Sequence, residues 1–212
     1  MQINQLRTRV KICGITRAED ALEAIRCGAD AIGLVFYAAS PRSVTVKQAQ
    51  TIVDAIPPLV SVVALFVNAS QAEIESILSQ VRIDIVQFHG DETASECERI
   101  KMPYFKAIRV KSDTNLLQCE VEFKGAKALL LDTFSEAAFG GTGHVFNWDL
   151  IPHNMSKPII LAGGLTSENV RLAIKKVQPY AVDVSGGVEQ SKGIKDVAKI
   201  AAFMQAVSDF KV

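Results

Sequence analysis

The chain has 212 residues and equal numbers of basic and acidic side chains, 23 of each, so its formal net charge is zero. Proteins that bind nucleic acids usually need a basic face, and the balanced charge therefore argues against nucleic acid as the main partner. Hydrophobic residues make up 49% of the chain and charged residues 22%, which is typical of a globular protein with one substantial core.

No part of the sequence predicts a targeting segment or a membrane span. The first nine residues lack an apolar stretch followed by a small-residue cleavage site. Every apolar run is interrupted by a charge, a glycine or a proline before it is long enough to cross a bilayer. We therefore expect a cytoplasmic protein with no membrane partner.

Short apolar runs alternate with longer amphipathic segments along the whole chain. Most of the runs are continuously apolar, as is typical of strands that are buried on both faces. In chain order they cover residues 10–13, 31–36, 60–67, 83–88, 104–108, 128–131, 159–162 and 181–184. The sequence thus predicts eight strands with crossover segments between them.

Several of the crossover segments carry signals of helix ends. Capping-box patterns, in which a serine or threonine is followed three residues later by Glu or Gln, begin at Thr16, Thr45 and Ser70. Gly28 fits the end of the first helix. The fifth crossover has the weakest helical pattern, which starts near Asn115 and stops before Gly125, so this helix should be short or irregular.

Eight buried strands with crossovers of this length predict an α/β fold, a single-domain (β/α)8 TIM barrel with a closed parallel sheet over residues 1–212. An open doubly wound sheet is the alternative. Such sheets usually carry a G-x-G-x-x-G turn after the first strand, and no such turn is present here. The sequence shows no linker, low-complexity segment or domain boundary.

Glycine-rich turns follow the last two predicted strands. They are Gly163-Gly164 and Ser185-Gly186-Gly187. Backbone amides at two neighbouring strand ends can bind one phosphate between them, and the last two loops of a parallel barrel often do so. We therefore expect a small-molecule phosphorylated substrate.

The ends of the other predicted strands carry side chains suited to proton transfer. They include Cys13, His89 and Asp132, with the loop of Arg42 after the second strand. The four cysteines form no C-x-x-C pair, and no histidine lies at metal-ligand spacing from them, so neither a metal site nor a disulfide is expected.

These residues, in this order, resemble the phosphoribosylanthranilate isomerase family of tryptophan biosynthesis. The stretch around Cys13 together with the stretch around Asp132 is specific, whereas the glycine pairs alone fit many phosphosugar barrels. The matching stretches are Lys11 to Thr16, Gly33 to Tyr37 with Ser40 to Arg42, Phe66 to Asn68, Val86 to Gly90, Leu130 to Thr133, Gly140 to Gly143 with Phe146 to Trp148, Ala162 to Leu165, and Val182 to Ser185.

The resemblance implies an Amadori rearrangement of N-(5-phospho-β-D-ribosyl)anthranilate to 1-(2-carboxyphenylamino)-1-deoxy-D-ribulose 5-phosphate, without a cofactor. It implies Asp132 as the general acid and Cys13 as the general base, facing each other across the barrel mouth. Asp132 would have to be kept protonated by burial or by anionic neighbours, and Cys13 would need nearby positive charge to ionise. Strand alternation puts Lys11 on the same face as Cys13.

The resemblance also implies the residues that bind the substrate. Arg42 would hold the anthranilate carboxylate, because a guanidinium fork matches a planar carboxylate. Asp183 would accept a hydrogen bond from a sugar hydroxyl. The backbone amides of Gly163, Gly164, Ser185 and Gly186 would hold the phosphate. The family usually has a serine at the position of Gly186, so we expect somewhat weaker phosphate binding in this chain.

Two other functions stay open. A related phosphosugar isomerase of histidine biosynthesis performs the same rearrangement, but resembles a pattern with aspartate, not cysteine, as the base at the first strand end. A non-catalytic phosphate-ligand binding barrel would tolerate Cys13→Ala and Asp132→Asn, because a fold alone does not establish an activity. The sequence assigns no role to His89 and does not distinguish a monomer from a homodimer.

Overall fold

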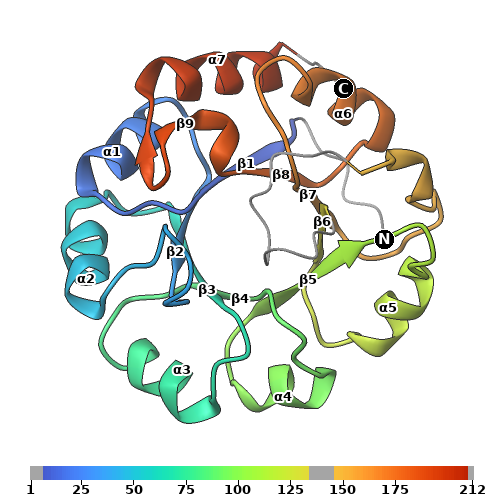
Figure 1. Cartoon of the computed structure of the whole chain (residues 1–212), viewed down its shortest axis with the longest axis horizontal. Helices are drawn as coiled ribbons and strands as arrows, with labels where there is room; N and C mark the ends of the chain where they lie inside the picture. Colours follow the sequence, from blue (N-terminus) through green and yellow to red (C-terminus); the bar gives the residue numbers. More distant parts are fainter. Residues whose placement is uncertain (1–6, 134–145, 210–212) are drawn as a thin grey trace.

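The computed structural model describes residues 7–133 and 146–209 of the chain. Eight parallel strands pair in chain order and close into a barrel, because β1 pairs with both β2 and β8 (Figure 1). All eight expected strands are confirmed, with ends that differ by at most two residues. They are β1 Arg9–Cys13, β2 Ala31–Val35, β3 Ser61–Phe66, β4 Ile85–Phe88, β5 Tyr104–Val110, β6 Leu129–Thr133, β7 Ile159–Leu161 and β8 Ala181–Val184.

The α-helices in the described residues form a ring outside the barrel (Figure 1). They are α1 Ala18–Arg26, α2 Val46–Ala55, α3 Gln71–Leu78, α4 Ala94–Arg99, α5 Leu116–Glu122, α6 Val170–Val177 and α7 Val197–Ser208. The helix of the fifth crossover, α5, is short as expected, with seven residues. The described residues between β6 and β7 contain the 3-10 turn η1, Trp148–Leu150. None of the helices in the described ranges has the length and apolarity that a membrane crossing needs.

The helix starts follow the sequence in two of the three expected places. Thr45 caps α2 and Ser70 caps α3, each with a complete capping box. The expectation for Thr16 is wrong, because α1 begins after Arg17 and the Thr16 hydroxyl donates to the carbonyl oxygen of Gly193 instead. A further capping box at Thr93, which the sequence reading missed, begins α4.

Apolar clusters lie on both sides of the barrel wall. The largest lies between the wall and the helices and contains Phe66, Phe88 and Phe203. A smaller cluster, with Phe105 and Leu130, gathers residues of the opposite strand faces. Because successive strand residues point to opposite faces, side chains such as Lys11 and Cys13 on β1 lie on the inner face.

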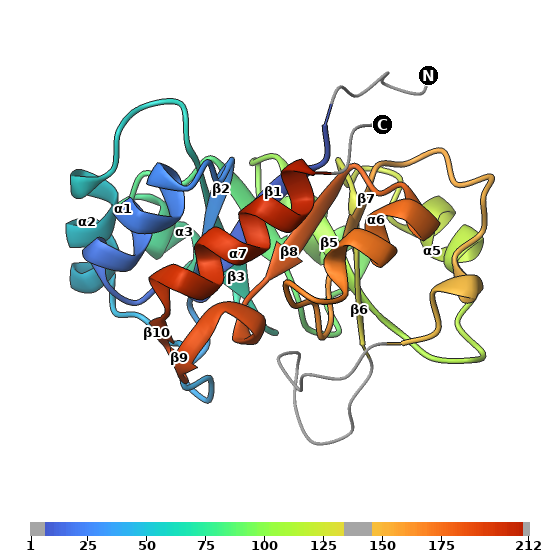
Figure 2. The ribbon, with the colours of Figure 1, turned by 90° about the horizontal axis from the view of Figure 1, so that it is seen from above.

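A short hairpin follows β8 and extends the rim of the barrel. The 3-10 turn η2, Gly186–Val188, leads into it. Its two antiparallel strands are β9, Glu189–Ser191, and β10, Ile194–Lys195. Figure 2 shows β9 and β10 beyond the end toward which β8 points. The sequence reading did not predict this hairpin. Gly140 to Gly143 lie outside the described residues.

Candidate active site

The two ionisable residues expected to do the chemistry lie at the same rim of the barrel. Cys13 ends β1, and Asp132 is the penultimate residue of β6. Both are buried, with 6% and 5% of their surface exposed. In the closed strand order they are separated by β7 and β8, so they are three strands apart on one ring.

Cys13 lies next to a buried ion pair. Lys11 Nζ donates to Asp183 Oδ1 at 2.9 Å, and both side chains are almost fully buried. Gly33 provides the space for this group. A Cβ atom at Gly33 would lie 2.8 Å from Cys13 Sγ and 3.0 Å from Lys11 Cε. The structure therefore brings Lys11 to the thiol, whereas strand alternation puts the two side chains on one face without deciding whether the lysine reaches Cys13.

The charges around Cys13 act in opposite directions on its thiol. Burial raises the pKa of the Cys13 thiol above its ordinary value and is the largest effect. The Lys11 ammonium lowers this pKa, whereas the Asp183 carboxylate raises it. Burial alone would lower the pKa of Lys11, but Asp183 and Cys13 hold it above its usual range. The free protein therefore carries a protonated thiol beside a charged lysine at neutral pH.

Asp132 is held by two hydrogen-bond partners. The backbone amide of Thr133 donates to Oδ1 at 2.8 Å, and Oδ2 lies 3.1 Å from His89 Nε2. The other ring nitrogen of His89, Nδ1, lies 2.7 Å from Gln87 Nε2. The sequence analysis asked for burial or anionic neighbours around this carboxyl, and the structure shows the burial.

Arg42 binds an acidic side chain of the hairpin that follows β8. Its Nε and Nη2 atoms donate to Oε1 and Oε2 of Glu189, both at 2.7 Å. Arg42 also lies close enough to Cys13 for the two to interact electrostatically. The arginine expected to hold the substrate carboxylate thus lies at the rim, with one edge of its guanidinium group occupied by Glu189.

The two glycine turns at the ends of β7 and β8 lie against each other. A Cβ atom at Gly187 would lie 2.0 Å from the carbonyl oxygen of Leu165, so the loops meet without space for a side chain. Ser185 and Gly186 open the turn η2, whose first amides have no partner within the turn. Gly164 has a φ of +64°, which a glycine adopts readily.

Gly163 lies against the end of β6, a contact that the sequence does not indicate. Its φ is +81°, and a Cβ atom there would lie 2.3 Å from Thr133 Oγ1 and 2.9 Å from Asp132 Oδ1. Gly163 therefore gives Asp132 the room to lie at the mouth. The sequence predicts for Gly163 only a role in binding phosphate.

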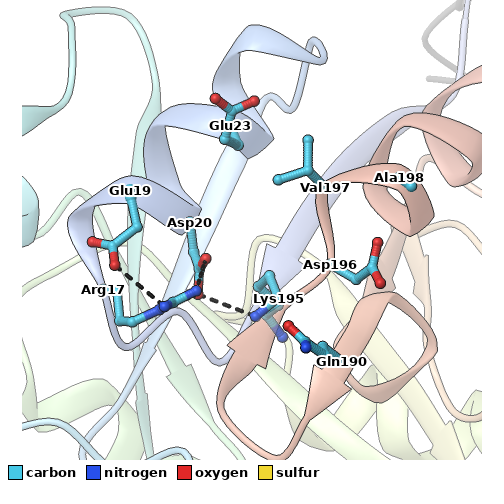
Figure 3. Close-up of a pocket in the computed structure, with 9 residues that line it drawn as sticks. All are labelled: Arg17, Glu19, Asp20, Glu23, Gln190, Lys195, Asp196, Val197 and Ala198. Carbon is cyan, nitrogen blue, oxygen red and sulfur yellow. Dashed lines mark hydrogen bonds and ion pairs between the residues drawn. The ribbon is translucent and has the colours of Figure 1, made fainter.

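An open cavity of about 450 Å³ lies to one side of this rim, between α1 and the start of α7 (Figure 3). Arg17, Asp20 and Lys195 line it, with Glu19, Glu23 and four residues between Gln190 and Ala198. None of the site residues expected from the sequence lines this cavity. Among the described residues, no group of His, Cys, Asp or Glu side chains is arranged to hold a metal ion.

The site contains side chains to which the sequence assigns no role. The sequence puts His89 at a strand end, and the structure brings it against Asp132. Glu189 follows the glycine turn after β8, and its charge next to that turn is a usable signal for a contact at the rim. Lys195 could not have been found, because only the hairpin brings it back to Glu189.

The sequence matches the family model described as N-(5'phosphoribosyl)anthranilate (PRA) isomerase over residues 10–206. It is 62% identical to the N-(5'-phosphoribosyl)anthranilate isomerase of Pseudomonas fluorescens strain SBW25 over 199 residues. This alignment covers 94% of the chain and 95% of its relative.

Solved structures give the same result. The phosphoribosyl anthranilate isomerase of Thermotoga maritima superimposes with a TM-score of 0.88 at 38% sequence identity, covering 96% of this chain and 100% of that one. A structure of a phosphoribosyl anthranilate isomerase in complex with reduced 1-(o-carboxyphenylamino)-1-deoxyribulose 5-phosphate has a TM-score of 0.85 at 38% identity, with the same coverage.

Proposed function

The chain belongs to the N-(5'-phosphoribosyl)anthranilate isomerase family of tryptophan biosynthesis, and from this premise we propose that it rearranges its substrate with Asp132 as general acid and Cys13 as general base. One observation carries this proposal. Two buried ionisable side chains, the carboxyl of Asp132 and the thiol of Cys13, lie at the same rim of the barrel as the glycine turns that follow β7 and β8.

The first step opens the furanose ring. Asp132 gives its proton to the ring oxygen while the bond from that oxygen to the first carbon breaks, and the anthranilate nitrogen supplies the electron pair that forms an iminium. Negative charge develops on Asp132 as the proton leaves. The Thr133 amide and His89 Nε2 stabilise this charge through their hydrogen bonds.

The second step moves a proton from the second sugar carbon. The resting thiol of Cys13 first loses its proton to solvent, and the minor thiolate form then takes the proton from the second carbon, while the electrons of the C–H bond form the enolamine. The enolamine becomes the ketone when its first carbon gains a proton and the hydroxyl on its second carbon loses one. Lys11 stabilises the thiolate, because its ammonium lowers the pKa of Cys13. Positioned acid–base catalysis of this kind contributes roughly 10²- to 10⁴-fold for each group.

The two ends of the substrate bind on either side of these groups. Arg42 holds the anthranilate carboxylate with the edge of its guanidinium group that Glu189 does not use. The phosphate is held by backbone amides of the two glycine turns, those of Gly163, Gly164, Ser185 and Gly186. Asp183 uses Lys11 as one partner and offers its other oxygen to a sugar hydroxyl.

The isomerase of histidine biosynthesis is the second candidate for the same chemistry. Its pattern has an aspartate as the base at the end of the first strand, where this chain has Cys13. A non-catalytic binding barrel would have no use for Lys11 and Asp183 buried beside that thiol. Both alternatives therefore receive less support from the site.

The proposal is tested with an anthranilate-fluorescence assay on freshly generated phosphoribosylanthranilate. Folded wild-type protein should turn the substrate over rapidly. A folded protein without turnover would contradict the activity itself, and the related ribotide and simple phosphate-ligand binding would then be measured next.

The ionisation of Cys13 gives a second expected result. Because burial raises the pKa of its thiol, most of Cys13 should still be protonated at pH 8.5, where an ordinary cysteine is half ionised. The measurement is a titration of thiolate ultraviolet absorbance, taken as the difference between wild type and Cys13→Ser. A difference signal that is complete below pH 8 would contradict this expectation.

Gly186→Ser should lower KM about two- to tenfold, because a hydroxyl added beside the phosphate gains one hydrogen bond. A serine fits here, since a Cβ atom at Gly186 meets only Arg42 Nη2, at an ordinary 3.5 Å. Steady-state kinetics measure the effect, and Gly186→Ala serves as the control that adds the carbon without the hydroxyl. An unchanged KM in the serine variant would show that this position does not touch the phosphate.

A further inference from the structure

A chain of buried charges joins Arg42 to the hairpin after β8. Both oxygens of Glu189 accept hydrogen bonds from Arg42, and Oε1 also accepts one from Lys195 Nζ at 3.0 Å. The side chains of Arg42, Glu189 and Lys195 are 12%, 6% and 0% exposed, so little water competes for these contacts. The proposed mechanism gives neither Glu189 nor Lys195 a role.

Lys195 is itself fixed from two directions. Its Nζ donates to the carbonyl oxygen of Ser185 at 3.2 Å, and its backbone amide donates to Asp20 Oδ2 at 3.1 Å. Asp20 is held in turn by Arg17, whose Nη2 lies 2.6 Å from Oδ1 (Figure 3). Lys195 is therefore anchored to α1 and to the end of β8 at the same time.

Glu189 keeps its charge in this setting. Burial alone would raise the pKa of its carboxyl, but Arg42 and Lys195 hold that pKa below its usual range. For Lys195, burial lowers the pKa more than Glu189 raises it. Glu189 is thus a carboxylate at neutral pH, and it binds Arg42 through two charge-assisted hydrogen bonds.

The guanidinium group of Arg42 has little freedom to turn. Glu189 binds its Nε–Nη2 edge, so the Nη1–Nη2 edge points in one fixed direction. The arginine side chain also lies directly on Gly14, where a Cβ atom would come within 2.5 Å of Arg42 Cδ. Gly14 has a φ of +72°, which disfavours any side chain at that position.

We propose that Glu189, anchored by Lys195, is a positioning residue that orients Arg42 and thereby sets the preference for ligands with an aromatic carboxylate. The inference rests on the proposed role of Arg42. A guanidinium group that is already oriented does not have to be ordered when the ligand binds, so its contact with a carboxylate gains affinity. Neutralising Glu189 would free Arg42 to rotate and would weaken that contact selectively.

The experiment compares two ligands of the same length. One is reduced 1-(o-carboxyphenylamino)-1-deoxyribulose 5-phosphate, and the other is its analogue made from aniline, which lacks the carboxylate. Wild type should bind the first at least about thirtyfold more tightly, because the second leaves Arg42 without its partner. In Glu189→Gln this ratio should fall about tenfold, through weaker binding of the carboxylate ligand alone.

Asp30→Asn is the matched control. Asp30 forms the same kind of two-pronged contact with Arg7, at 2.6 and 2.8 Å, but at the opposite end of the barrel, before β2. This variant should lose thermal stability and keep the wild-type ligand ratio. A loss of stability without a change in ratio for Glu189→Gln as well would reduce Glu189 to a structural role and overturn the inference.

The outcomes separate this inference from the proposed function. If wild type binds both ligands equally well, the role of Arg42 is wrong. If wild type prefers the carboxylate and Glu189→Gln keeps the full ratio, Arg42 binds the carboxylate without help from Glu189. If Glu189→Gln fails to fold, Lys195→Met tests the same anchor. In this variant we expect the ratio of the affinities for the two ligands to fall about threefold. An unchanged ratio there would overturn the positioning role of the pair.

Discussion

Replacement of Asp132 by asparagine is expected to lower kcat by roughly 10²- to 10⁴-fold and to leave KM almost unchanged. Asparagine has nearly the same shape, and its side-chain oxygen can still accept the Thr133 amide that now lies 2.8 Å from Oδ1. It has no acidic proton to give to the furanose ring oxygen. The loss should therefore fall on the chemical step and not on substrate binding.

Asp91→Asn provides the control for the Asp132 variant. Asp91 lies in the loop after β4, close in sequence to His89, but its side chain is 65% exposed and pairs with Arg109. Its replacement should change kcat by less than about twofold, since exposed ion pairs contribute little. Steady-state fluorescence kinetics on folded variants decide the matter. An Asp132→Asn protein that keeps a tenth of the wild-type kcat would exclude Asp132 as the acid.

The fold could be predicted from the sequence because the strands of a closed parallel sheet are buried on both faces. Runs such as 128–131 are continuously apolar for that reason, and β6 was found there. The wrong helix cap came from a contact between distant parts of the chain. Thr16 has the sequence pattern of a helix cap, but its hydroxyl binds Gly193, which is 177 residues away. The helix-capping propensity of a short segment cannot predict a contact with so distant a residue.

The candidate site was predictable to the extent that it follows from strand order. Once eight strands are placed, Cys13 and Asp132 must lie at one rim, because all strands point the same way. Strand alternation puts Lys11 on the same strand face as Cys13. The partner of Lys11 does not follow from it, since Asp183 reaches the lysine only through the pairing of β1 with β8 that closes the barrel.

The contacts that orient the catalytic and binding groups were not predictable. Arg42 and Glu189 are 147 residues apart, and only the hairpin after β8 brings them together. His89 could be placed at a strand end, but its contact with Asp132 depends on side-chain orientation across the inner face of the barrel. A sequence pattern can thus identify which groups react, while three-dimensional packing decides how they are held.

Replacement of Cys13 by serine is expected to reduce kcat by roughly 10²- to 10⁴-fold, because a serine hydroxyl ionises far less readily than a thiol and cannot take the carbon proton. Serine is smaller than cysteine, so the space beside Gly33 and Lys11 accepts it. Cys27→Ser, at the half-buried position after α1, should keep the wild-type rate. Near-wild-type turnover by Cys13→Ser would assign the base to another group.

Cys13→Asp tests whether any ionisable group at the end of β1 can act as the base, or whether the size and shape of the thiol are needed. Aspartate restores an ionisable group at the end of β1, and Lys11 would favour its charged form as it favours the thiolate. Its carboxylate is larger than a thiol and presses on the space over Gly33, where a Cβ atom would already lie 2.8 Å from Sγ. We therefore expect turnover above that of Cys13→Ser and below that of wild type, measured in the same fluorescence assay. If the aspartate variant is no faster than the serine variant although both fold, the thiol contributes something other than a base.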